Sequence, residues 1–129
     1  MTAQDALARH RLARARTALE EGELLVSAER WNGALNRIYY AAFYAARALL
    51  ALKRIDSSRH SGVIALFQEH FVKTGIVSPD VARALPQAFG KRQHSDYDDF
   101  AQAEPQEIKT LREQVERFVR ACEDAVNSA

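Results

Sequence analysis

The side chains with the greatest potential for chemistry lie together near residue 95. From Gly90 to Phe100 the chain reads GKRQHSDYDDF, which combines two cations, an imidazole, a phenol and several carboxylates. A guanidinium can bind a phosphate, and an imidazole can exchange a proton near neutral pH. The alternative is that Lys91 and Arg92 only complement the negative end of a helix, while the aspartates form a solvated loop.

Several other kinds of active site lack the residues they need. None of the four histidines follows a glutamate by three positions, so the pattern of a di-iron bundle is missing. The five glycines are isolated, which excludes a glycine-rich phosphate loop. The single cysteine, Cys122, precedes Glu123 and Asp124, whose charges disfavour a thiolate nucleophile. We therefore expect neither a metal site nor a cofactor.

Length and composition indicate one helical domain over residues 1–129. The chain is 47% hydrophobic and has only 5 Gly and 3 Pro, fewer breakers than the many turns of a sheet protein require. Its 18 basic and 17 acidic side chains give a net charge of +1. Because no global field attracts nucleic acid, any RNA binding must be local.

The sequence also predicts a cytoplasmic protein without membrane association. No window approaches the roughly 20 apolar residues of a membrane span, and the N-terminus lacks the apolar core of a secretory signal. The lone cysteine cannot form an internal disulfide, which fits a reducing compartment.

Two long helices are predicted first. Leu12, Leu19 and Val26 recur every seven residues and predict a helix over about 4–29, which Gly22 would bend or fray. A second helix is expected from an N-cap at Asn32 to about residue 53. Its wide face of alanine and aromatic side chains is typical of a central helix.

The remaining helices follow from capping and proline signals. A third is predicted over 60–73 with Gly75 just after it, and a fourth starts with Ser78 as N-cap and Pro79 in the first turn. Pro86 should break or kink this helix near residue 85, before helix resumes toward Arg92 and a polar segment over 94–102 follows. Pro105 begins the last helix. The predicted fold is all-α, an antiparallel bundle of four or five helices.

Four stretches together resemble the HEPN families of small bacterial and archaeal proteins. Their order and spacing make the resemblance specific, and it covers residues from about 12 to 120. The stretches are NRIYYAAF at 36–43 with AARALL at 45–50, HSGV at 60–63, Phe67 with FVKTG at 71–75, and Arg92 leading to Asp96 and Tyr97. Within the first stretch we interpret Arg37 and Tyr40 as packing residues of the bundle.

The resemblance implies a helical bundle that forms a homodimer. Many such proteins are paired with a minimal nucleotidyltransferase as toxin–antitoxin systems, and some are metal-independent endoribonucleases. Their motif is an arginine followed, after four to six residues, by a histidine, and the dimer joins two copies into one RNA cleft. The resemblance makes Arg92 the motif arginine, with Lys91, Asp96 and Tyr97 as further RNA or nucleotide contacts. Tyr97 also has the position of a tyrosine that partner nucleotidyltransferases modify with AMP in some related toxins.

This sequence departs from the family motif at the histidine. No histidine follows Arg92 at the required spacing, so we take His94, two residues on, as the candidate substitute. Arg54 and His60 have the right spacing, but they lie in a predicted connector and we interpret their spacing as coincidence.

The departure leaves two hypotheses for the function. In RNA cleavage, imidazole suits proton transfer and arginine suits stabilisation of the phosphorane, so phosphate binding survives loss of the histidine more readily than catalysis does. The first hypothesis is a HEPN toxin–antitoxin component that binds RNA or a nucleotide through Arg92 and cleaves RNA with His94. The alternative is a non-catalytic interaction domain that regulates a nucleotidyltransferase.

Overall fold

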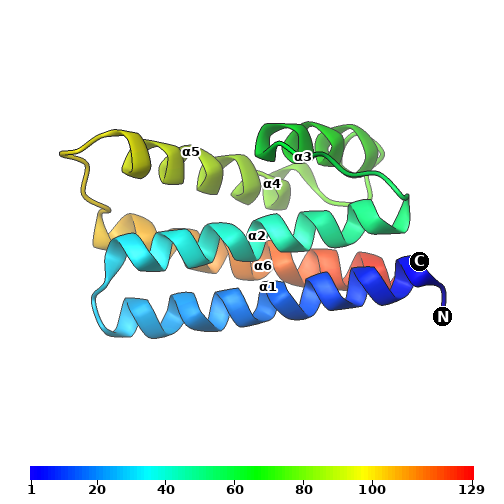
Figure 1. Cartoon of the computed structure of the whole chain (residues 1–129), viewed down its shortest axis with the longest axis horizontal. Helices are drawn as coiled ribbons and strands as arrows, with labels where there is room; N and C mark the ends of the chain where they lie inside the picture. Colours follow the sequence, from blue (N-terminus) through cyan, green and yellow to red (C-terminus); the bar gives the residue numbers. More distant parts are fainter.

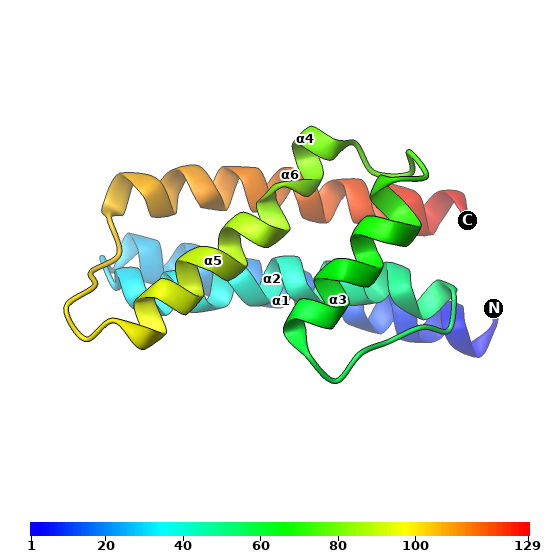
Figure 2. The same ribbon diagram turned by 90° about the horizontal axis from the view of Figure 1, so that it is seen from above.

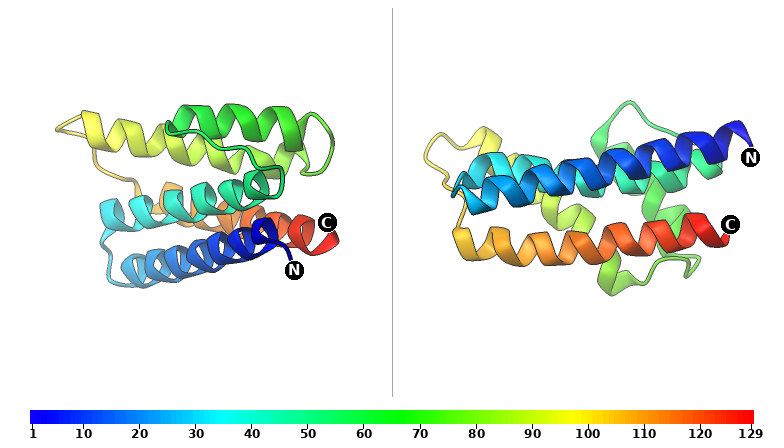
Figure 3. Two further views of the ribbon diagram at one scale, coloured as in Figure 1. Left: turned by 45° about the vertical axis from the view of Figure 1, so that its right-hand side comes forward. Right: turned by 90° about the horizontal axis from the view of Figure 1, so that it is seen from below.

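Three long helices form the body of the molecule. The computed structural model describes all 129 residues and contains α1 (Ala3–Ser27), α2 (Trp31–Leu52) and α6 (Pro105–Ser128). Helices α1 and α2 form an antiparallel hairpin, and α6 runs in the same direction as α2 (Figure 1). Seen from below, α1 and α6 lie side by side (Figure 3).

The shorter helices cover the side of α2 that faces away from α1. They are α3 (His60–Phe67), which continues into a π-helical segment over Gln68–Val72, then α4 (Pro79–Ala82) and α5 (Ala84–Tyr97). Both α3 and α5 cross over α2 at an oblique angle (Figure 2). Helix α2 is therefore central, and the predicted all-α bundle is confirmed.

The core is one continuous apolar cluster built around α2. Its largest fully buried side chains are Tyr39 of α2, Phe67 of α3 and Phe118 of α6. No helix combines the length and the hydrophobicity that crossing a lipid bilayer requires.

Gly22 lies in an uninterrupted helix, so the predicted bend or fray is absent. The residue is buried against α2, and a Cβ atom added to it would lie 2.9 Å from Cγ1 of Ile38. Glycine therefore serves close packing of the two helices at this position.

Other predicted boundaries shift by one to three residues. Helix α2 begins at Trp31, so Asn32 is not its N-cap; instead the Asn32 Oδ1 atom accepts a hydrogen bond from the Ala103 backbone at 3.3 Å. Ser78 and Pro79 start α4 as predicted, although the Ser78 side chain makes no capping bond. Gly75 has a φ of +80°, a conformation that favours glycine.

Pro86 breaks the helix earlier than predicted, at Arg83. Proline has no N–H to donate to the carbonyl of Ala82 four residues back, and its ring crowds that group. Helix α4 consequently ends at Ala82, and α5 begins at Ala84 with Pro86 in its first turn.

The predicted polar segment is helical over its first part. Helix α5 continues through Tyr97 and ends where Asp98 becomes extended. Successive side chains from residue 92 to residue 97 are therefore rotated by about 100° about the axis of one helix. This periodicity decides which of them share a face.

Candidate functional site

The guanidinium of Arg92 is held above two aromatic rings of α2. Its Cζ atom lies 5.1 Å from the ring centre of Tyr39 and 5.0 Å from that of Tyr40. Both separations are within the range of a cation–π interaction. Only 24% of the Arg92 side chain is exposed, so the cation is partly desolvated at the surface of the bundle.

Asp96, one turn later on α5, is the only carboxylate paired with Arg92. The Arg92 Nε and Asp96 Oδ2 atoms are 3.4 Å apart, but their geometry does not make a hydrogen bond, and Nε is buried without a hydrogen-bond partner. Buried polar groups of proteins usually have partners. The guanidinium is thus oriented and retains donors for an additional acceptor.

His60, the first residue of α3, lies beside the same pair of tyrosines. Its Nδ1 atom is 2.6 Å from the hydroxyl of Tyr39, and its ring stacks on Phe43 with 4.3 Å between centres. Its Nε2 atom makes no hydrogen bond within the protein. Tyr39 is fully buried and contacts both His60 and Arg92, so it joins an imidazole from α3 to a cation from α5.

The surroundings favour neutral forms of both ring systems. Burial lowers the pKa of His60, and the positive charges of Arg92 and Arg47 lower it further. Burial raises the pKa of Tyr39 well above that of a free phenol, although the charge of Arg92 opposes this shift. A neutral imidazole beside a permanent cation can exchange a proton while the cation holds an anion.

Lys91 and His94 face α6 instead of this site. The Lys91 Nζ atom forms an ion pair with Glu107 at 3.2 Å, and His94 lines a hollow of about 230 Å³ with Lys91, Glu104 and Glu107. Residues two apart on a helix diverge by about 200°, which separates His94 from Arg92. The structure therefore brings Arg92 and Asp96 together and places Lys91 and His94 on the opposite side of α5.

Tyr97, the last residue of α5, contributes to neither group. Tyr97 is 85% exposed and is one of the large hydrophobic residues that lie at the surface. The hydroxyl makes no hydrogen bond within the protein, so it is open to solvent.

The sequence reasoning missed His60 and Tyr39 as site residues. His60 begins the HSGV stretch, and its spacing from Arg54 was interpreted as coincidence, so it was not considered as a partner of Arg92. Arg54 is exposed in the turn after α2, whereas the cations near His60 are Arg92 and Arg47. One sequence signal could have identified His60. It is a histidine at the start of a predicted helix, and that helix has to pack on the tyrosines of α2.

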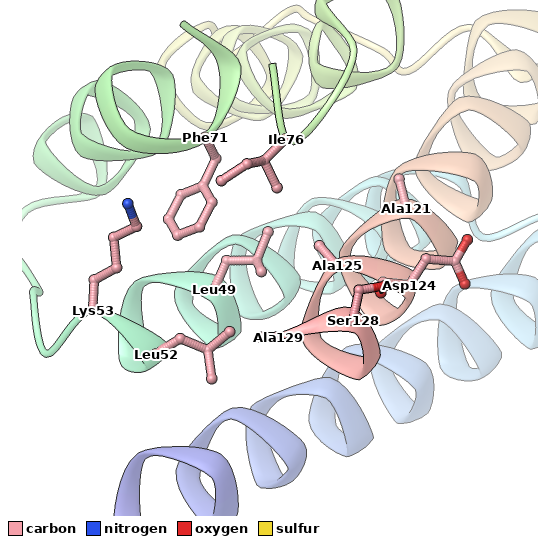
Figure 4. Close-up of a pocket in the computed structure, with 10 residues that line it drawn as sticks. All are labelled: Leu49, Leu52, Lys53, Phe71, Ile76, Ala121, Asp124, Ala125, Ser128 and Ala129. Atoms are coloured by element: carbon pink, nitrogen blue, oxygen red, sulfur yellow. Dashed lines mark hydrogen bonds between the residues drawn. The ribbon is translucent and has the colours of Figure 1, made fainter. Parts of the chain in front are cut away.

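A larger hollow lies at the opposite end of the bundle, away from Arg92. It encloses about 570 Å³ between the last turns of α2 and α6. Figure 4 shows Phe71 and Ile76 directed toward Leu49 and the small side chains of α6. Its lining is mostly apolar, and the charged side chains in it are those of Lys53 and Asp124.

Other reactive groups are sparse. No three His, Cys, Asp or Glu side chains are close enough to hold a metal ion. Cys122 is fully buried, and burial together with the nearby Glu123 raises the pKa of its thiol. The chemistry that the fold assembles is therefore centred on Arg92 and His60.

The fold and the site together define a class of protein. It is an all-α bundle with a partly buried arginine above the aromatic rings of its central helix. The chain belongs to the HEPN domain family, whose model matches residues 8–125. A UPF0332 protein of Thermotoga maritima is 39% identical over 113 residues, which cover 88% of this chain and 86% of that protein.

Two similar proteins of Methanocaldococcus jannaschii carry the name "Putative toxin". One is 35% identical over 98 residues, covering 76% of this chain and 67% of the relative. The other is 30% identical over 101 residues, covering 78% of this chain and 75% of the relative.

Proposed function

We propose that this HEPN protein is the toxin-like component of a toxin–antitoxin pair and that it binds RNA through Arg92. The observation that carries the proposal is the convergence of Arg92 and His60 on the single buried side chain of Tyr39. The names of the two M. jannaschii relatives support the toxin-like role.

The pair of side chains suits metal-independent cleavage of RNA. In the proposed reaction Arg92 binds a phosphate and stabilises the charge of the phosphorane. His60 accepts the proton of the 2′-hydroxyl through Nε2 as the bond from the 2′ oxygen to phosphorus forms. The bond to the 5′ oxygen then breaks, and that oxygen takes a proton from the imidazolium of a second copy or from water.

The contact with Tyr39 helps His60 to act in either direction. When Nδ1 donates its proton to the Tyr39 oxygen, Nε2 is free to accept a proton; in the imidazolium that results, Nδ1 keeps this hydrogen bond and Nε2 carries a proton that it can give. A composite cleft of two copies would supply one neutral imidazole as the base and one imidazolium as the acid. We therefore include a homodimer in the proposal.

A minimal nucleotidyltransferase is the proposed partner, and Tyr97 is its proposed target. The exposure of the Tyr97 side chain at the end of α5 makes its hydroxyl accessible to a modifying enzyme. An AMP group there would add negative charge close to Asp98 and Asp99, which would disfavour RNA binding at the same end of the helix.

The alternative function is a non-catalytic interaction domain that regulates the nucleotidyltransferase. It is favoured by the position of His94, which faces α6 and is separated from Arg92. In this case the Arg92 site would bind a nucleotide or an acidic partner without chemistry.

A cleavage assay in the presence of EDTA tests the proposal. The wild type should cleave a labelled single-stranded RNA, Arg92→Ala should lose both binding and cleavage, and His60→Ala should bind but cleave at least about 100-fold more slowly. His94→Ala and the exposed-charge control Arg117→Gln should match the wild type. If the wild type binds RNA but leaves it intact under all conditions, the interaction-domain function is the correct one.

A further inference from the structure

A second cationic site lies between α1 and α2. A hollow of about 240 Å³ is lined there by two arginines, a histidine and a tyrosine, together with small side chains and one glutamate. The charged and aromatic lining residues are His10, Arg14, Glu21, Arg37 and Tyr44. None of them belongs to the Arg92 site.

Arg14 is a cation without a carboxylate partner. Its Cζ atom lies 4.3 Å from the ring centre of Tyr44, and its Nη2 atom donates a hydrogen bond of 2.8 Å to the hydroxyl of the same residue. Two other arginines of α1 have carboxylate partners, since Arg11 pairs with Asp56 and Arg16 pairs with two glutamates of α6. Arg14 is thus held in place but electrostatically uncompensated.

Arg37 is held in a similar way on α2. Its Cζ atom lies 5.1 Å from the ring centre of Tyr40, and its Nη2 atom donates a 3.0 Å hydrogen bond to the side chain of Asn36. The nearest carboxylate oxygen, on Glu21, is 3.6 Å away and the Glu21 side chain is half exposed. The ion pair is therefore weak and can give way to a phosphate.

The aromatic rings of α2 connect this hollow to the Arg92 site. Tyr44 and Tyr40 are one turn apart, with 5.6 Å between ring centres, and Tyr40 contacts both Arg37 and Arg92. Arginine side chains and tyrosine rings thus lie next to one another from the hollow to the Arg92 site. Proteins bind single strands in this manner, with cations along the phosphates and aromatic faces against the bases.

We propose that the hollow at Arg14 and Arg37 is a second phosphate subsite and that the ligand is a single RNA strand spanning both sites. This inference rests on the proposed function and narrows it, because a free nucleotide would occupy only the Arg92 site. The uncompensated charge of Arg14 then has a role that packing of the bundle does not require.

The test is RNA affinity as a function of salt. Fluorescence anisotropy with a labelled single-stranded RNA of about ten nucleotides should show that Arg14→Gln and Arg37→Gln each weaken binding by about tenfold. Each variant should also lower the slope of log affinity against log salt by about 0.7, the value expected when one phosphate of a single strand is no longer neutralised by the protein. Arg117→Gln, which removes an exposed arginine of α6, should change neither quantity.

Binding of AMP separates this inference from the proposed function. AMP should bind the wild type, Arg14→Gln and Arg37→Gln equally and should lose affinity in Arg92→Ala, provided that thermal melting shows each variant folded. If Arg14→Gln and Arg37→Gln keep wild-type RNA affinity and slope while Arg92→Ala loses both, only the second subsite is wrong. If the wild type binds neither RNA nor AMP, both proposals fail.

Discussion

The hydroxyl of Tyr39 and the Nδ1 atom of His60 lie 2.6 Å apart, although the two residues belong to different helices. Tyr39 is a fully buried residue of α2, whereas His60 is partly exposed at the start of α3. One end of the contact is therefore anchored in the core and the other reaches the candidate site. Stability and activity should both depend on it.

Removal of this hydroxyl should affect both properties. Tyr39→Phe leaves Nδ1 of His60 without a partner, so the free energy of unfolding should fall by about 1 kcal/mol. The proposed cleavage should slow through kcat with little change in KM, because the imidazole is no longer oriented. Tyr40→Phe is the matched control, since the Tyr40 hydroxyl makes no hydrogen bond within the protein. Equal effects of the two substitutions, measured by denaturant titration and kinetics, would contradict the role of the contact.

The neutral state of His60 should make the fold sensitive to mild acid. The pKa of His60 is lowered in the folded protein by burial and by the charges of Arg92 and Arg47, whereas the unfolded imidazole has its ordinary value near 6.5. As pH falls below about 6.5, the unfolded state takes up more protons, and the free energy of unfolding decreases.

His60→Gln removes this contribution and serves as the comparison. Melting temperatures measured between about pH 7.5 and 5.5 should fall less steeply for His60→Gln than for the wild type. Parallel curves would mean that His60 does not account for the pH dependence. A saturating RNA ligand should reduce the acid sensitivity of the wild type, because a phosphate near His60 stabilises the imidazolium.

The shape of the Arg92 side chain should matter as well as its charge. Arg92→Lys keeps a cation but loses the planar group above Tyr39 and Tyr40, so RNA affinity should fall by about tenfold. The dependence of affinity on salt should change little, because one positive charge remains. Anisotropy titrations measure both quantities, and full affinity in Arg92→Lys would show that stacking is unimportant.

Two glycines should respond in opposite directions to alanine. Gly22→Ala gains about 1 kcal/mol of helix propensity, but its Cβ would lie 2.9 Å from the buried Ile38 side chain, an overlap that costs about 1–3 kcal/mol. Its melting temperature should therefore fall, by roughly 4 °C. Gly90→Ala adds a Cβ with nothing within 4 Å on helix α5, so it should stabilise by up to about 1 kcal/mol. Stabilisation by both would contradict the close packing of α1 on α2.

The sequence alone determined the helices and singled out the arginine of the candidate site. Periodic apolar residues and Pro79 act within a few turns of the chain, so the all-α class and most helix positions could be predicted from them. The HEPN resemblance pointed to Arg92 because the family motif is also local, a short and continuous stretch of the chain. Predictions were wrong where a local signal yielded to packing, as at Gly22, which meets Ile38 of a different helix.

Only the tertiary structure decided which groups accompany Arg92. Helix α5 continues past residue 92, so its rotation carries His94 toward α6. His60 reaches the site because the chain after α2 runs back beside that helix before α3 begins (Figure 2). Neighbours in sequence are separated by the helical turn, and residues 32 positions apart share the ring of Tyr39 because their helices pack on the same face of α2.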